Sequence, residues 1–236
     1  TKENWLLNFM DNAGVYNEEM LEMDKHRLEY FYRDHGYLMA KVAKADVEFS
    51  EDKKNISVTF YIKEGNLFTV RELHVVGDEI HDEKELMPLV QLEQDAPFSQ
   101  NKLVGTMNKI KDLYGEKGYI YCDVYPQVKP DETTNDVDIT FHVERGKKLY
   151  ANRIDITGNK VTRDKVIRRQ LEIVEGDLIT TQKLSQSRTS VEYLSYFEKD
   201  GANWKTHRLT DELADLEMNV QEAKTGNLNF MATYGT

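Results

Sequence analysis

Six histidines and a single cysteine are the side chains best suited to hold a metal ion or to act as nucleophiles. Metal sites on helices usually pair histidines three or four positions apart, and no two histidines of this chain have that spacing. Neither an HExxH nor a CxxC motif is present. The spacing therefore predicts no metal site. The histidines are His26, His35, His74, His81, His142 and His207.

Cys122 and the acidic pairs do not form a recognisable catalytic set either. Cys122 stands alone, which excludes an intrachain disulfide, and its inward strand position suits a small buried side chain. Asp82-Glu83 and Asp211-Glu212 stand in turns or first helical turns, where capping and solvation explain them. GxSxG, P-loop and GxGxxG motifs are absent. We therefore expect no catalytic residue, no cofactor and no enzymatic activity.

Composition narrows the class of partner. The 236 residues carry a formal net charge of −11, which disfavours nucleic acid because phosphate binding needs a basic face. Hydrophobic residues make up 39% and charged residues 31% of the chain. No apolar run approaches the roughly 20 residues of a membrane helix. The chain begins in the middle of a structural pattern, so we expect it to be an excised fragment.

The elements that position these side chains form a tandem repeat. After Gly118-Tyr119, apolar and polar residues alternate, which predicts strands with one buried face. Gly36-Tyr37 lies 82 residues earlier (118 − 36), and Gly65 lies 81 residues before Gly146 (146 − 65). Apolar positions keep the same register through both copies, and chance does not explain this agreement.

Each complete copy predicts the order strand, helix, helix, strand, strand. We expect three domains and a tail, covering 1–67, 68–148, 149–226 and 227–236. The first domain lacks its opening strand, and the tail alternates like a single transmembrane β-barrel strand.

Glycines mark the same turns in successive copies. Gly77 and Gly158 each follow a strand and are expected to turn the chain with positive φ. The Gly-Tyr pair is expected to end the long helix with a glycine cap. In the third copy Tyr196-Phe197 stands in the place of that pair.

A βααββ unit of about 80 residues with these markers resembles the POTRA repeat, the polypeptide-transport-associated domain. The markers are RDHGYLMAKV…SVTFYIKEG and GEKGYIYCDV…DITFHVERG, with VVGDE and ITGNK opening the following units. The resemblance implies an α+β fold of tandem βααββ POTRA domains. Each domain would be a three-stranded mixed sheet covered by two helices, and the domains would form an elongated arm.

The tail resembles the junction at which the last POTRA domain of BamA-type assembly factors enters the first barrel strand. That junction has a Gly-x-x-x-Phe run ending in Tyr-Gly, matched here by Gly226, Phe230, Tyr234 and Gly235. The resemblance implies the third, fourth and fifth of five POTRA domains, with the barrel removed. The third unit departs from the family because it lacks the Gly-Phe pair usual at its helix end.

This resemblance implies a periplasmic role at the outer membrane of a Gram-negative bacterium. Such an arm binds unfolded outer-membrane proteins, accessory lipoproteins and periplasmic chaperones, and reaches the outer membrane through the missing barrel. It helps to pass clients to the barrel for insertion. Two alternatives stay open: the POTRA arm of a related translocation or secretion transporter, and a POTRA scaffold without a barrel, such as a division protein.

In the POTRA fold the strand after Gly-Tyr is the sheet edge, so the first domain offers 41–49 as a peptide-binding edge. An extended peptide can pair with an edge backbone with little sequence demand, which is β-augmentation. In the second domain Pro126 is expected to interrupt the corresponding strand and weaken binding. A capped or solvated edge is the alternative. The edge begins with Lys41 and Val42, and the predicted inward residues Ala43, Ala45, Val47 and Phe49 then alternate with Lys44, Asp46 and Glu48.

The short helix of the third domain carries a basic cluster in an otherwise acidic chain. It is a candidate for contact with the membrane, a lipoprotein or the underside of the barrel, and an ordinary solvated helix face is the alternative. The cluster consists of Arg163, Lys165, Arg168 and Arg169.

Overall fold

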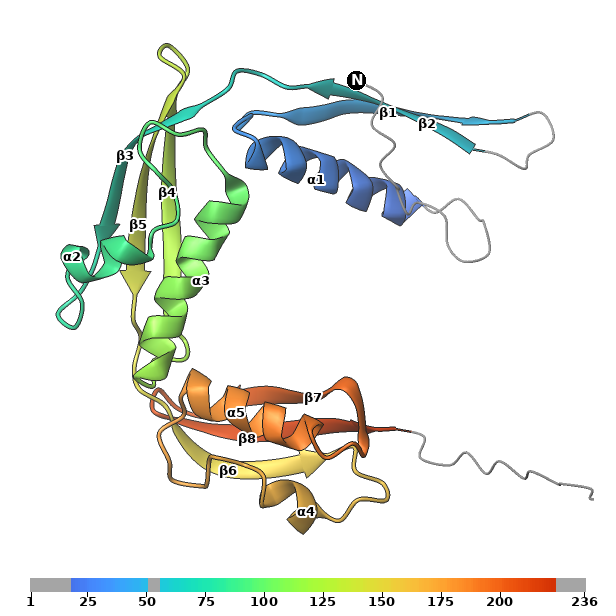
Figure 1. The fold of residues 1–236 in the computed structure, drawn as a ribbon, viewed down its shortest axis with the longest axis vertical. Coiled ribbons are helices and arrows are strands. Elements are labelled where there is room, and N and C mark those ends of the chain that lie inside the picture. The colour runs from blue at the N-terminus through green and yellow to red at the C-terminus, as the bar shows by residue number, and fades with distance from the viewer. Residues whose placement is uncertain (1–17, 51–55, 224–236) are drawn as a thin grey trace, which may run out of the picture. The chain divides into compact units, whose positions relative to one another are not determined.

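The computed structural model describes residues 18–50 and 56–223, in three successive repeats (Figure 1). The first repeat contains helix α1 (Glu18–Asp34) and strands β1 (Lys41–Phe49) and β2 (Ile56–Lys63). The two strands pair antiparallel. Alternation of apolar and polar residues predicted both strands at these positions, and that prediction is confirmed.

The second repeat is built on a sheet with strand order β3-β5-β4. Its central strand β5 pairs in parallel with β3 across the helical connection. The elements are β3 (Thr69–Val76), α2 (Glu83–Leu86), the 3-10 turn η1 (Met87–Leu89), α3 (Gln100–Glu116), β4 (Asp123–Asp131) and β5 (Asp136–Glu144).

Pro126 does not interrupt β4, contrary to the expectation from sequence. The strand continues through Pro126 and also contains Pro130. Both prolines are compatible with an edge strand, because the side of the strand that faces away from β5 has no ladder partner and needs no N–H donor.

The third repeat has the same order of elements, and its sheet is ordered β6-β8-β7. β8 pairs in parallel with β6 and antiparallel with β7, so the sheet is mixed as predicted. The ladder of β7 shifts register between Phe197 and Ala202, where Asp200 has φ +59°. The sequence over 198–210 does not alternate regularly between apolar and polar residues, and this register shift is consistent with that pattern. The elements are β6 (Tyr150–Thr157), α4 (Asp164–Arg168), α5 (Thr181–Glu192), β7 (Phe197–Arg208) and β8 (Leu213–Glu222).

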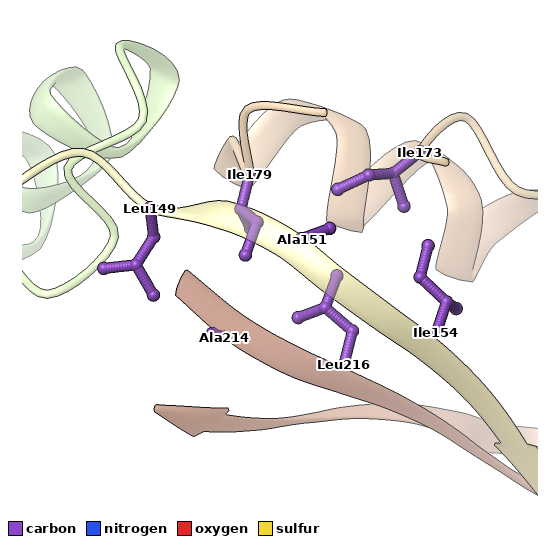
Figure 2. Packing of buried hydrophobic residues seen from close by; sticks show 7 residues of the cluster. All are labelled: Leu149, Ala151, Ile154, Ile173, Ile179, Ala214 and Leu216. Atoms are coloured by element: carbon purple, nitrogen blue, oxygen red, sulfur yellow. The ribbon is translucent and has the colours of Figure 1, made fainter. Parts of the chain in front are cut away.

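Buried aliphatic side chains join sheet and helices in the third repeat (Figure 2). Ile154 of β6 and Leu216 of β8 are 2% and 0% exposed, and they share a cluster with Ile173 and Ile179 from the connecting segments. Trp204 packs against the cluster and donates its indole N–H to the carbonyl of Leu184 in α5 at 2.9 Å. The helical layer is therefore fixed to the sheet by apolar burial and by one satisfied polar group.

The long helices of the first two repeats end in the same Schellman motif. Gly36 and Gly118 have φ of +94° and +91°, a region that costs other residues energy. The N–H of Tyr37 donates to the carbonyl of Tyr32 at 3.0 Å, and Tyr119 donates to Tyr114 at 3.1 Å. The paired tyrosine rings pack edge to face in both motifs. The predicted glycine caps are confirmed.

One other turn prediction, that for Gly77, is wrong. Gly158 has φ +85°, as expected, but Gly77 does not have positive φ. Gly77 is required for space instead, because a Cβ there would lie 2.1 Å from the carbonyl oxygen of His81. In the third repeat the left-handed residue is Ser195, with φ +54°, and it precedes the Tyr196-Phe197 pair.

A single buried residue connects each of the first two helix ends to the next repeat. The N–H of Phe68 donates to the carbonyl of Gly36 at 2.9 Å, and the carbonyl of Phe68 accepts from Phe98 at 3.0 Å. Leu149 bonds in the same way to Gly118, at 3.2 Å, and to Ile179, at 2.8 Å. Phe68 and Leu149 are each 1% exposed.

No helix in the described parts of the chain is long and apolar enough to span a membrane.

Candidate partner-binding surfaces

The predicted edge strand β1 pairs with β2 along one side. Within residues 18–50 and 56–63 the sheet of the first repeat consists of these two strands, so β1 has a single strand neighbour there. β4 and β7, which hold the same place in the other repeats, also lie at the edges of their sheets. The strand after the long helix is therefore an edge strand in each of the three described sheets.

A β-bulge near the start of β1 changes which of its side chains face inward. Val42 pairs with Ile62 and Lys44 pairs with Tyr61, so Ala43 is the extra residue. Ala43 is exposed, and Phe49 at the other end is 56% exposed. The predicted inward series is therefore wrong at both ends of the strand, and only Ala45 and Val47 retain partial burial.

The first backbone donor of this edge is occupied by a side chain of α1. The N–H of Val42 donates to Glu29 Oε1 at 3.0 Å. Beyond it, Lys44 Nζ lies 2.7 Å from an oxygen of Asp46 and 5.7 Å from the centroid of the Tyr61 ring. The hydrogen bond and the charge of Asp46 raise the pKa of Lys44. Glu29 thus caps one end of the edge, and the accessible part begins after Val42.

Only two members of the basic cluster on α4 lie together. Arg163 and Arg169 line a surface pocket of about 390 Å³ with Tyr196 and Glu222 among its walls. Lys165 is exposed and lies outside this lining.

Arg168 is not part of that pocket's lining, and its guanidinium bonds to other groups of the same repeat. Its Nε donates to Asp164 Oδ1 at 2.9 Å, and its Nη2 donates to the carbonyl of Ile154 at 3.1 Å. The hydrogen bond to Asp164 raises the pKa of Arg168. The four residues therefore do not form one continuous cationic surface.

Glu222 at the wall of this pocket is held by the loop before α4. Its carboxylate accepts the backbone N–H groups of Lys160, Val161 and Thr162 at 2.7 to 3.1 Å. The hydrogen bond from Thr162 is the main cause that lowers the pKa of Glu222. This carboxylate is thus bonded to the loop backbone, and it remains an anion in the wall that also carries the two arginines.

The acidic pairs have structural partners. Asp82 is the N-cap of α2 and accepts the N–H of Glu85 at 3.0 Å. Asp211 accepts a hydrogen bond from Arg208 at 2.8 Å. Across residues 18–50 and 56–223, no group of three or more histidine, cysteine, aspartate and glutamate side chains could hold a metal ion.

The sequence-predicted junction residues lie outside the described residues: Gly226, Phe230, Tyr234 and Gly235.

One buried charge escaped the sequence analysis. Asp24 on α1 is 1% exposed, and its Oδ1 accepts a hydrogen bond from Arg27 at 2.9 Å. Its other oxygen has no hydrogen-bond partner within the described residues. Helical spacing places Asp24 three residues after the buried Leu21, and this spacing was the available signal.

Comparison with known proteins agrees with this architecture. The family model described as "POTRA: Surface antigen variable number repeat" matches residues 1–65, 68–146 and 149–223. The outer membrane protein assembly factor BamA of Neisseria meningitidis serogroup B is 29% identical over 231 residues, which cover 98% of this chain and 29% of that protein. BamA of Neorickettsia risticii is 31% identical over 240 residues, covering 100% of this chain and 31% of that protein. The chain thus spans less than a third of the length of these relatives.

A solved structure shows the same fold. The crystal structure of Haemophilus influenzae BamA POTRA3-5 has a TM-score of 0.79 and 23% identity, and the match covers 88% of this chain and 82% of that chain. Three consecutive matches to the family model account for most of the sequence. The chain therefore belongs to the POTRA family and contains three POTRA repeats.

Proposed function

We propose that the chain is the periplasmic POTRA segment of a BamA-type outer-membrane protein assembly factor of a Gram-negative bacterium. The observation that carries the proposal is the similarity of nearly the whole chain to two BamA proteins, in three consecutive POTRA matches. The segment binds unfolded outer-membrane proteins, accessory lipoproteins and periplasmic chaperones, and passes clients to a barrel. It acts by binding and has no catalytic role.

The domain assignment belongs to the same proposal. Residues 1–67, 68–148 and 149–226 are the third, fourth and fifth POTRA domains, and the predicted tail, 227–236, lies outside the described residues. The fold of the Haemophilus influenzae POTRA3-5 structure supports this order.

Clients bind the first domain by pairing with β1. The N–H of Val42 points to Glu29, away from β2, and N–H directions alternate along a strand. The bulge at Ala43 adds one residue, so Ala45 and Val47 direct their N–H groups away from β2. These two donors form the centre of the peptide-binding edge. β4 binds peptides less well, because Pro126 and Pro130 lack donors.

Arg163 and Arg169 provide a separate contact. Their shared pocket suits an acidic side chain of a lipoprotein better than a flat membrane surface, because two guanidinium groups face one recess. Arg168 contributes nothing to this contact, since it is committed to Asp164 and Ile154.

A proline scan of β1 tests the edge assignment. Ala45→Pro and Val47→Pro should weaken binding of a labelled, extended peptide from an outer-membrane protein strand about tenfold, with an unchanged circular dichroism spectrum. Asp46→Pro should disturb the ladder to β2 and destabilise the first domain. Val47→Ala, which keeps the N–H, is the control and should bind normally. Unchanged binding by both folded proline variants would refute the edge assignment.

A further inference from the structure

A basic pocket lies at the start of the third repeat, apart from the edges and from α4. It has a volume of about 370 Å³. Its loop has the sequence Arg-Gly-Lys-Lys, so three of four consecutive residues are cationic in a chain with net charge −11. The pocket is lined by Tyr119, Arg145, Gly146, Lys147, Lys148, Tyr150 and Glu212.

Two of the three cations of this pocket lie against an aromatic ring. Arg145 Cζ and Lys148 Nζ lie 5.3 and 5.6 Å from the centroid of Tyr119. Tyr119 belongs to the Schellman motif of α3, and the buried Leu149 bonds to Gly118 beside it. Cation–π contacts and a fixed backbone thus position the charged groups before any partner binds.

The equivalent loop of the preceding repeat shows that the fold does not require these charges. That loop, 64–67, is Glu-Gly-Asn-Leu, with formal charge −1, whereas 145–148 has formal charge +3. Both loops have a glycine with positive φ and lead into the same hydrogen bond to a helix-ending glycine. The pocket beside Gly65 and Asn66 measures about 330 Å³ and carries Lys41 and Glu132 in its lining, so a pocket of similar volume forms there without a surplus of cations.

We propose that this pocket, called here the Tyr119 pocket, binds an acidic segment of a protein partner. Lys147 already lies 3.3 Å from Asp211 Oδ2 and 3.9 Å from Glu212 Oε1, so carboxylates are its ligands within the chain. Tyr150, 41% exposed, adds an apolar wall for a neighbouring side chain of the segment. An extended anionic lipid surface would face Asp211 and Glu212 together with the lysines, which disfavours its binding. A single peptide can place a carboxylate near Lys148 and avoid Glu212.

The test uses the whole chain and a fluorescein-labelled peptide that alternates Asp, Glu and Phe, with its Asn and Gln counterpart as the uncharged probe. We expect the acidic peptide to bind and the uncharged peptide not to bind. The affinity for the acidic peptide should fall as the salt concentration rises. Lys147→Gln with Lys148→Gln should weaken binding about fivefold, and Lys147→Glu with Lys148→Glu more than tenfold. Lys199→Glu on β7, outside the pocket, should change the affinity for the acidic peptide less than twofold.

The neutral double variant keeps the test valid if charge reversal disturbs folding, and circular dichroism checks both. Equal binding of the charged and uncharged peptides would overturn the proposal, as would normal binding by the folded double variants. Vesicles of phosphatidylglycerol and phosphatidylcholine form a separate arm. Cosedimentation that depends on Lys147 and Lys148, without peptide binding, would replace the protein partner by a membrane. This test does not depend on the proline scan of β1. The Tyr119 pocket proposal can therefore fail while the proposed function stands.

Discussion

Asp34, the last residue of α1, and Asn101, near the start of α3, are joined by two hydrogen bonds. The backbone N–H of Asn101 donates to Asp34 Oδ1 at 2.8 Å, and its side-chain amide donates to Oδ2 at 2.5 Å. Ser99 adds a third bond to Oδ1 at 2.5 Å. A carboxylate of the first repeat therefore accepts one orphan backbone donor at the N-terminus of a helix in the second repeat, together with two side-chain donors.

Replacement of Asp34 should loosen this connection. Asp34→Ala removes all three bonds, and we expect the free energy of unfolding to fall by about 1 kcal/mol, because the site is partly exposed. Urea denaturation followed by circular dichroism measures the change. Asp112→Ala, at an exposed carboxylate on α3, is the matched control and should leave the midpoint unchanged.

The same carboxylate predicts a pH dependence. Burial alone would raise the pKa of Asp34, but hydrogen bonds from Ser99 and Asn101 outweigh it and lower the pKa below its ordinary value of 3.8. A depressed folded-state pKa gives stability that is present above the unfolded value and lost as pH falls below it. The urea midpoint of the wild type should drop below pH 4 more steeply than that of Asp34→Asn. If the urea midpoints of the two proteins fell in parallel with pH, Asp34 would not be the source of the pH dependence.

Two glycines separate the cost of backbone conformation from the cost of crowding. Gly118 and Gly176 have φ of +91° and +89°, but a Cβ at Gly118 would lie 2.6 Å from a methyl group of Leu178, whereas none lies within 4 Å at Gly176. Gly176→Ala should cost about 1 kcal/mol, and Gly118→Ala about 2 kcal/mol or more. Thermal or urea unfolding of the two variants tests this order. Equal losses would show that Leu178 moves aside freely.

Glu222 should control the mobility of the loop before α4. In Glu222→Ala the N–H groups of Val161 and Thr162 lose their acceptor. Hydrogen exchange at these amides should accelerate at least tenfold, while amides of α5 keep their protection. Glu172→Ala, at an exposed glutamate of the same repeat, is the control. Exchange that stays slow in Glu222→Ala would mean that other acceptors hold the loop.

Sequence periodicity predicted the elements well because each strand and long helix buries one face. The bounds of β1 and β2 follow directly from alternation. The bulge at Ala43 could not be predicted, since alternation carries no information about which residue lacks a ladder partner. Pro126 suited an edge strand, as the sheet order β3-β5-β4 bears out, but the interruption expected there was wrong, because an edge strand keeps its ladder to the inner neighbour when an outward N–H is missing.

The candidate surfaces were harder to predict than the fold. The spacing of Asp164 and Arg168 already favours an ion pair across one helical turn, which removes Arg168 from the basic cluster. The Tyr119 pocket required a comparison of charge between repeats, because the Arg-Gly-Lys-Lys loop looks like an ordinary solvated turn in isolation. Its contact with Tyr119 depends on a helix end that lies more than twenty residues away in the chain, and local patterns do not report such contacts.

Phe68 donates to one repeat and accepts from the next, and this double role has a mechanical consequence. Tension applied to the chain at 64–67 must break the hydrogen bond to Gly36 and expose the buried Phe68 ring before the two repeats separate. Leu149 stands at the same point of the next connection. A stretched chain should therefore yield in discrete steps at these two residues, with each repeat still folded when its neighbour is released.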